Sequence, residues 1–170
     1  MKRKIATVYL TVGLPGSGKT TWARNLTRKK PGTVIVCRDE LRTMLLGRYA
    51  IIPRCEHLVT ELTLSMVNLA VGLGHNVIID ETNLTAGRRR EWLRNLKNIR
   101  RRTRRNIRIV FVWFTEMKRN LGNRMKDPRG LSRRKWASVI AFMKKKFEEP
   151  RPSEGCDKIL KISHFRVSHG

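Results

Sequence analysis

The strongest structural signal in this chain is the stretch GLPGSGKT at residues 13–20, which matches the Walker A pattern at every position. The apolar run Ala6–Val12 directly precedes it and a helical pattern follows, which is the setting that the pattern requires. Glycines let backbone N–H groups approach phosphate oxygens closely, and the start of the following helix adds the positive end of its dipole. The stretch therefore predicts a phosphate-binding loop between a strand and a helix.

Two side chains of this loop have expected roles toward a nucleoside triphosphate. Lys19 would bridge the β- and γ-phosphates, and Thr20 would ligate Mg²⁺. We therefore expect ATP as the phosphate donor and Mg²⁺ as the metal. The residues expected to bind the donor in and after the loop are Gly13, Pro15, Gly16, Ser17, Gly18, Lys19, Thr20 and Thr21.

Short apolar runs rich in β-branched residues alternate along the chain with longer helical patterns. Such runs indicate buried parallel strands, and they lie at Ala6–Val12, Thr33–Cys37, Asn76–Asp80, Ile107–Trp113 and Lys158–Ile162. The alternation predicts an α/β fold with a mostly parallel sheet of about five strands, helices on both faces and ligands at the carboxyl ends of the strands. A length of 170 residues is that of one ordinary domain.

Two of the helical patterns have an apolar face that we expect to pack on the core. The first face comprises Leu58, Leu62, Met66, Leu69 and Leu73, at steps of 4, 4, 3 and 4 residues. The second face comprises Trp136, Val139, Ile140, Met143 and Phe147.

An acid and an arginine follow the second predicted strand. Asp39 would lie at the carboxyl end of that strand, in the same crevice as Lys19, and Arg42 would share its helix face. A carboxylate there can accept the proton of a hydroxyl that attacks a γ-phosphate, and an arginine can hold a phosphate of the acceptor. Asp is also a favoured helix N-cap, so a catalytic and a capping role for Asp39 are both open.

Two further acids end the third predicted strand, in the stretch Asp80-Glu81-Thr82-Asn83. Either acid can hold Mg²⁺ or orient a neighbouring arginine, and Thr82 and Asn83 can contact an acceptor. The alternative is a strand end followed by a capping Thr or Asn. The position at the carboxyl end of a strand favours the functional interpretation and leaves both acids as candidates for the metal.

The chain has 38 Lys and Arg residues against 13 Asp and Glu residues, a formal net charge of +25 that attracts polyanions. The segment from Arg88 to Arg108 is especially basic and contains a single acid, Glu91. A solvated helix face usually mixes both signs, so nucleic-acid phosphates are the favoured partner of this segment. A membrane surface is the weaker alternative, because the apolar side of the helix is needed for the core.

Several classes of protein are excluded. No apolar run approaches the roughly 18 residues of a membrane span. Cys37, Cys55 and Cys156 form no C-x-x-C pair, which argues against a zinc site or a disulfide framework and favours a reducing, cytoplasmic location.

Taken in order, these motifs resemble the 5′-hydroxyl polynucleotide kinase family, in particular the kinase domain of its phage-type end-healing members. The resemblance spans about the first 162 residues and rests on the Walker A stretch with Thr21-Trp22-Ala23-Arg24, Arg38-Asp39-x-x-Arg42, and Asp80-x-Thr82-Asn83-Leu84 with Arg88-Arg89. The stretches Phe147-Glu148-x-Pro150 and Glu154-Gly155-x-Asp157-Lys158-Ile159 are similar to the wider family of small P-loop kinases. The resemblance implies a single P-loop kinase domain over residues 1–170, with a helical lid at about 115–132.

The same resemblance implies roles for individual residues. Asp39 would be the general base for the 5′-hydroxyl, and Arg42 would hold the acceptor phosphate. A lid arginine would engage the transferring phosphate, with Arg124 the favoured candidate and Arg119 a further donor contact. The implied catalytic residues are Lys19, Asp39, Arg42 and Arg124. The implied acceptor-binding residues are Arg38, Asp39, Arg42, Thr82, Asn83, Arg88 and Arg89.

The expected activity is in-line transfer of the γ-phosphate of ATP to 5′-OH ends of RNA or DNA, as in nucleic-acid end repair, in the cytoplasm of a cell or of a virus's host. One alternative is a P-loop kinase for a small-molecule hydroxyl, although a small acceptor needs only a local cationic site. The other is a nucleic-acid-binding NTPase without phosphoryl transfer, against which the Asp39-x-x-Arg42 motif argues.

Overall fold

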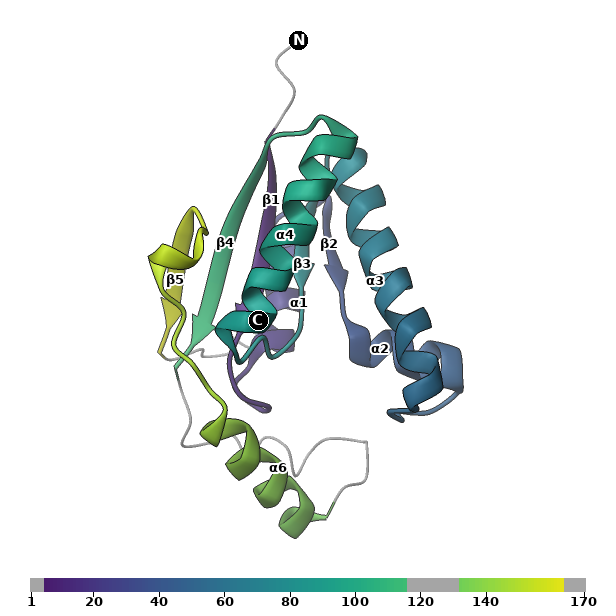
Figure 1. Cartoon of the computed structure of the whole chain (residues 1–170), viewed down its shortest axis with the longest axis vertical. Coiled ribbons are helices and arrows are strands. Elements are labelled where there is room, and N and C mark those ends of the chain that lie inside the picture. Colours follow the sequence, from purple (N-terminus) through teal and green to yellow (C-terminus); the bar gives the residue numbers. More distant parts are fainter. Residues whose placement is uncertain (1–4, 116–131, 164–170) are drawn as a thin grey trace.

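The computed structural model describes residues 5–115 and 132–163, which form one open parallel sheet with helices on both faces. The sheet has the strand order β2-β3-β1-β4-β5 (Figure 1). Its strands are β1 (Ala6–Val12), β2 (Thr33–Val36), β3 (Asn76–Ile79), β4 (Ile107–Phe114) and β5 (Lys158–Ile162). All neighbouring strands pair in parallel. The predicted α/β fold is therefore confirmed, with strand ends displaced by at most one residue.

The strands form because their residues are apolar and β-branched and find cover on both faces. In β1, Val8 lies between Val77 of β3 and Ile109 of β4, and the side chain of Val8 is completely buried. A strand buried on both faces has a continuous run of apolar residues, and this run is the feature that predicted β1 from the sequence.

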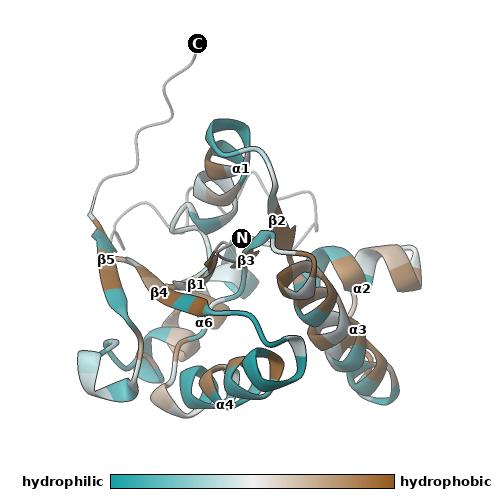
Figure 2. Cartoon of the chain, turned by 90° about the horizontal axis from the view of Figure 1, so that it is seen from above, coloured by the Kyte–Doolittle hydropathy of each residue, from teal (hydrophilic) through white to brown (hydrophobic). Residues whose placement is uncertain are grey.

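Two helical layers cover the sheet. Helix α1 (Lys19–Lys29) lies on one face, and α3 (Pro53–Gly72) and α4 (Ala86–Thr103) lie on the other (Figure 2). Trp22 and Ala23 of α1 pack on one side of the sheet, whereas Val67 of α3 and Trp92 and Leu96 of α4 pack on the opposite side. Among the described helices, none is both long and apolar enough to cross a membrane.

The face of α3 that packs on the sheet is not the predicted one. Its buried residues are Val59, Thr63, Val67, Ala70 and Val71. The expected core residues Leu58, Leu69 and Leu73 are 50%, 63% and 65% exposed. The two series are one residue apart and share the helical period, so spacing alone cannot choose between them. The smaller side chains are the ones that allow the helix to lie close to the sheet.

The remaining elements surround the carboxyl ends of the strands. Helix α2 (Arg38–Leu46) follows β2, helix α6 (Arg133–Lys145) lies beyond the end of β4, and the short 3₁₀ helix η1 (Pro152–Glu154) precedes β5 (Figure 1). The predicted apolar face of α6 does not pack on the core of the sheet: only Phe147, just after the helix, does so, whereas Trp136 is buried and Met143 half-buried outside both core clusters. Most of the expected lid, with Arg119 and Arg124, lies outside the described residues.

Candidate active site

The phosphate-binding loop connects β1 to α1, and its backbone depends on glycines with positive φ, of which Gly18 and Gly13 show the reason most clearly. Gly18 precedes the first residue of α1 and has a φ of 92°, a left-handed conformation that side chains rarely adopt. A Cβ atom on Gly13 would lie 3.0 Å from Ser17 Oγ and 3.1 Å from Phe114 Cβ. Any larger residue at Gly13 would therefore push the loop away from the end of β4.

Lys19 is the first residue of α1, and its ammonium group lies inside the loop. The side chain is 7% exposed, and Nζ donates to the carbonyl oxygens of Gly13 at 3.0 Å and Leu14 at 2.7 Å. The ammonium group and the N-terminal N–H groups of α1 thus occupy one small volume. This concentration of donors fits the oxygens of a triphosphate.

Asp80 follows β3 and lies close to the loop. The carboxyl is 6% exposed and lies beside the Thr20 side chain, while its Oδ2 atom has no hydrogen-bond partner among the described residues. Burial raises the pKa of Asp80, against the opposing effects of Thr20 and of the charge on Lys19. A buried carboxylate oxygen beside a threonine hydroxyl fits Mg²⁺, which takes few protein ligands and completes its shell with phosphate and water.

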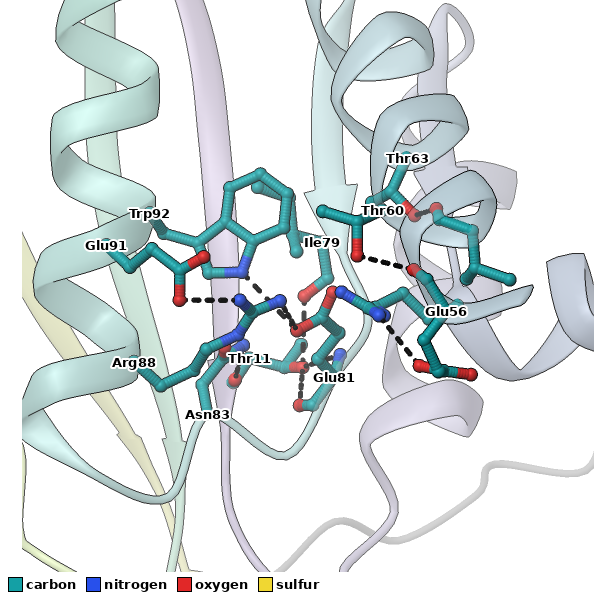
Figure 3. A network of polar contacts seen from close by, with 12 residues as sticks. Thr11, Glu56, Thr60, Thr63, Ile79, Glu81, Asn83, Arg88, Glu91 and Trp92 are labelled. Carbon is teal, nitrogen blue, oxygen red and sulfur yellow. Dashed lines mark hydrogen bonds and ion pairs between the residues drawn. The ribbon is translucent and has the colours of Figure 1, made fainter. Parts of the chain in front are cut away.

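The neighbouring acid, Glu81, is engaged by α4 instead (Figure 3). Its Oε2 atom accepts from Nη2 of Arg88 at 3.1 Å and from Nε1 of Trp92 at 3.3 Å. Nη1 of Arg88 also donates to Glu91, at 2.7 Å. Glu81 also has a buried oxygen, Oε1, without a partner among the described residues, so the preference for Asp80 as metal ligand rests on its position beside Thr20 and Lys19. The contacts of Oε2 hold Arg88 in place.

Asp39 does not cap helix α2. The N-cap residue is Cys37, which makes no side-chain capping bond, and Asp39 is the second residue of the helix. Its Oδ1 atom accepts from Nη1 of Arg42 at 2.8 Å, and 43% of the side chain remains exposed. Of the two roles that the sequence left open for Asp39, the structure therefore removes the capping role.

Arg42 is held from a second side by Glu56 of α3, a residue that the sequence analysis missed. Oε1 of Glu56 accepts from Nε of Arg42 and Oε2 from its Nη2, both at 2.7 Å, while Arg38 donates to the same Oε2 at 3.0 Å. The hydrogen bonds from Arg42 hold the pKa of Glu56 below its usual value. The available signal was an acid in the first turn of a helix in a chain with few acids.

A cavity of about 830 Å³ brings both halves of this site together. Its polar lining includes Arg38, Asp39, Arg42, Asp80, Glu81, Thr82 and Arg88, and Pro15 of the phosphate-binding loop also faces it. Its apolar lining consists of Tyr49, Ile51, Trp136, Val139, Phe142 and Met143. The cavity thus joins the loop, the ends of two strands and α6.

Two residues expected to contact an acceptor lie inside the protein, and this is a correction to the sequence analysis. Arg89 is completely buried, and its Nε and Nη2 atoms each donate to Glu154 at 2.8 Å. Its Nη1 atom donates to the carbonyl oxygens of residues 83, 84 and 148. Asn83 is 2% exposed, has a φ of 45° and donates to the Thr11 carbonyl oxygen at 2.9 Å. Arg89 and Asn83 therefore position the surrounding loops instead of facing the cavity.

The chain belongs to the AAA_33 family, because the model of this family, an AAA domain, matches residues 8–150. Its fold is similar to that of a fungal RNA kinase, with 13% identity and a TM-score of 0.73 over 99% of this chain and 81% of that chain. It is also similar to a chain of the Pnkp1/Rnl/Hen1 RNA repair complex, with 25% identity and a TM-score of 0.59 over 85% of this chain. This match spans only 47% of the repair-complex chain.

A further similar structure is the Mycobacterium tuberculosis APS kinase CysC in complex with AMPPNP and APS. The identity is 17% and the TM-score 0.59, over 95% of this chain and 91% of that chain. Together the matches confirm the predicted P-loop kinase fold and the resemblance to small P-loop kinases of the polynucleotide kinase type. A kinase fold of this type supports phosphotransferase activity with a nucleotide donor.

Proposed function

We propose that this protein is an ATP- and Mg²⁺-dependent 5′-hydroxyl polynucleotide kinase that acts on RNA or DNA ends in nucleic-acid repair. The observation that carries the proposal is the cavity in which Asp39 and Arg42 lie within one enclosure with the phosphate-binding loop and Asp80. Such an enclosure can hold a donor γ-phosphate and an acceptor hydroxyl side by side, which is the main requirement of phosphoryl transfer.

On the donor side, the loop amides and Lys19 would bind the triphosphate, and Thr20 and Asp80 would hold Mg²⁺. The metal, when bound, neutralises charge on the phosphate oxygens. Lys19 would exchange its contacts with the loop carbonyl oxygens for contacts with phosphate oxygens. The lid arginines Arg119 and Arg124 stay in the proposal as candidate contacts of the transferring phosphate, with Arg124 favoured.

On the acceptor side, the Asp39 carboxylate would take the proton of the 5′-hydroxyl. A bond forms between that oxygen and the γ-phosphorus, and the bond from the γ-phosphorus to the bridging oxygen of ADP breaks. Arg42 has five N–H groups and uses three in its contacts with Asp39 and Glu56, so its guanidinium retains donors for an acceptor phosphate. Arg38, Thr82 and Arg88 line the same cavity and would contact the acceptor strand.

The proposal is tested by incubating the protein with γ-labelled ATP and a panel of acceptors. The panel contains 5′-OH RNA and DNA oligomers, the same oligomers with a 5′-phosphate, free nucleosides and sugars, with a Lys19→Ala preparation as control for contaminating kinases. We expect label on the 5′-OH oligomers alone. Label on a nucleoside or sugar in preference to the oligomers would identify a small-molecule kinase, and release of inorganic phosphate alone would identify an NTPase.

A further inference from the structure

The basic segment predicted from the sequence extends far from the cavity. Arg88 lines the cavity near the first turn of α4, whereas the last turn of α4 leads into the amino end of β4. Figure 1 shows the connection between α4 and β4 at the end of the molecule opposite α6. At a rise of about 1.5 Å per residue, Arg101 lies about 20 Å along the helix from Arg88. The end of α4 is therefore a surface separate from the active site.

Exposed cations form a continuous row along the outer face of α4. They are Arg90, Arg94, Lys97 and Arg101, at steps of 4, 3 and 4 residues. This spacing places them on one side of the helix, with about 4.5–6 Å of rise between neighbours. Trp92, Leu96 and Ile99 occupy the opposite side and are buried in the core. Figure 2 shows the corresponding contrast between the hydrophilic and the apolar side of α4.

The distal end of this row concentrates positive charge. Arg100, Arg101 and Arg102 occupy the last turn of α4, and a surface hollow of about 430 Å³ beside them is lined by Lys97, Arg100, Arg101, Arg104, Arg105 and Asn106. Among the described residues, the ion pairs of α4 involve Arg88 and Arg89 near its start and none of the three arginines of its last turn. Glu61 lines the neighbouring groove together with Arg102, but cations outnumber acids around the two hollows. Neighbouring cations repel one another, and a bound polyanion relieves that repulsion.

The groove beside this end has the chemistry of a nucleic-acid contact. It lies between α3 and α4 and is lined by Glu61, Leu64, Ser65, Asn68, Asn95, Asn98, Ile99 and Arg102. Amide and hydroxyl side chains hydrogen-bond to phosphates, sugars and bases. A membrane-binding helix would instead present its apolar side to lipid, whereas here that side is buried against the sheet.

We propose that the outer face of α4, from Arg90 to Arg102, binds the backbone of the acceptor strand at a distance from its 5′ end. The direction of the strand rests on the proposed function, which places the 5′-hydroxyl beside Asp39. A distance of about 20 Å corresponds to about six nucleotides of helical strand at 3.4 Å each. A strand stacked as in a duplex needs about six nucleotides to reach the distal arginines, and a more extended single strand needs fewer.

Two variants with equal charge changes test this surface. The first is Arg100→Gln, Arg101→Gln and Arg102→Gln together, in the last turn of α4. The control is Arg28→Gln, Lys29→Gln and Lys30→Gln together, three exposed cations at the end of α1 on the opposite face of the sheet. Binding of a 5′-phosphorylated single strand of about 20 nucleotides is measured against salt without ATP. We expect the α4 variant to lose about two units of the log–log slope and the control variant well under one.

Steady-state kinetics supply the second readout. For the α4 variant we expect the KM of a strand of about 20 nucleotides to rise roughly tenfold, with the KM of an acceptor of about three nucleotides and both kcat values unchanged. Equal effects in the two variants, or an equal rise of KM for the short acceptor, would overturn the proposal. An unchanged slope for the α4 variant would also overturn it. If that variant in addition lost binding to phosphatidylserine vesicles, the partner of this surface would be a membrane. A reduced slope in a protein that labels no strand would refute the kinase function but retain the docking surface.

Discussion

Adjacent arginines on α4 have entirely different environments. Arg88 lines the cavity between Glu81 and Glu91, Arg89 is buried against Glu154, and Arg90 is exposed. A helix turns about 100° per residue, so three consecutive side chains point to the site, the interior and the solvent. The sequence identifies all three as cations, and only packing tells which of them can meet a substrate.

Lys19→Ala removes the side-chain cation of the phosphate-binding loop. We expect strand labelling at saturating acceptor to fall at least ~10²-fold, since a positive charge next to the transferring phosphate is lost. The measurement is the initial rate with γ-labelled ATP, together with a melting curve to verify folding. A folded variant with near-wild-type rate would exclude the loop as the donor site.

The residues that local motifs predicted best are those whose neighbours are close in sequence. The contact between Asp39 and Arg42 follows from their spacing of three residues, and the structure contains it. Glu56 was missed because its partner Arg42 lies 14 residues away on another helix. The assignment of Asn83 and Arg89 to the acceptor was wrong. Both are buried by the way loops and helices pack, and local motifs do not record that packing.

In helix α3, the buried face and the predicted leucine face should contribute very differently to the free energy of unfolding. Val67 is completely buried, whereas Leu69 on the predicted face is 63% exposed. We expect Val67→Ala to lower the free energy of unfolding by about 1.5–2.5 kcal/mol, through lost burial and a small cavity. Leu69→Ala should change it by about 0.5 kcal/mol or less. Urea unfolding of both variants makes the comparison, and a larger effect for Leu69 would restore the face predicted from the leucines.

Helices α2 and α3 are joined by Glu56, so this contact is a second determinant of stability. In Glu56→Gln, Arg38 and Arg42 lose their anionic partner, and we expect the free energy of unfolding at pH 7 to fall by about 1–2 kcal/mol, allowing for partial exposure. Glu61→Gln, an exposed acid on the same helix, is the matched control and should change it by about 0.5 kcal/mol or less.

The same variant has a predicted pH dependence. The pKa of Glu56 is lowered from its ordinary value of 4.5 in the folded protein. The stability that Glu56 contributes is therefore fully present above pH 4.5 and is lost as the pH falls through the lowered value. Urea unfolding of wild type and Glu56→Gln at several pH values should show a difference that is constant near neutrality and shrinks in acid. A difference that persists unchanged in acid would contradict the ion pair.

The architecture of the whole molecule explains why the sequence was most informative about fold and donor site. Parallel strands end at one edge of the sheet, so the loop after β1, the start of α2 after β2 and Asp80 after β3 converge there without any long-range signal. The apolar wall supplied by α6 could not be predicted in this way, because α6 lies beyond the sheet and its position depends on tertiary packing.

The net charge of +25 has a consequence for the stability of the molecule as a whole. Like charges repel more strongly in the compact state, and salt screens this repulsion. We expect the melting temperature at pH 7 to rise between about 20 and about 200 mM NaCl. A fall over the same range, measured by differential scanning calorimetry, would mean that attractive ion pairs outweigh the net repulsion.

Asp39→Asn tests the proposed chemistry at its reacting group. Wild type and variant are compared in single-turnover transfer from γ-labelled ATP to a 5′-OH strand, with ATP binding and a melting curve measured on the same preparations. Because the amide cannot accept the hydroxyl proton, the transfer rate should fall by ~10²–10⁴-fold while ATP affinity stays nearly constant. Transfer at the wild-type rate would remove Asp39 from the mechanism and contradict the account of this cavity as the site of phosphoryl transfer.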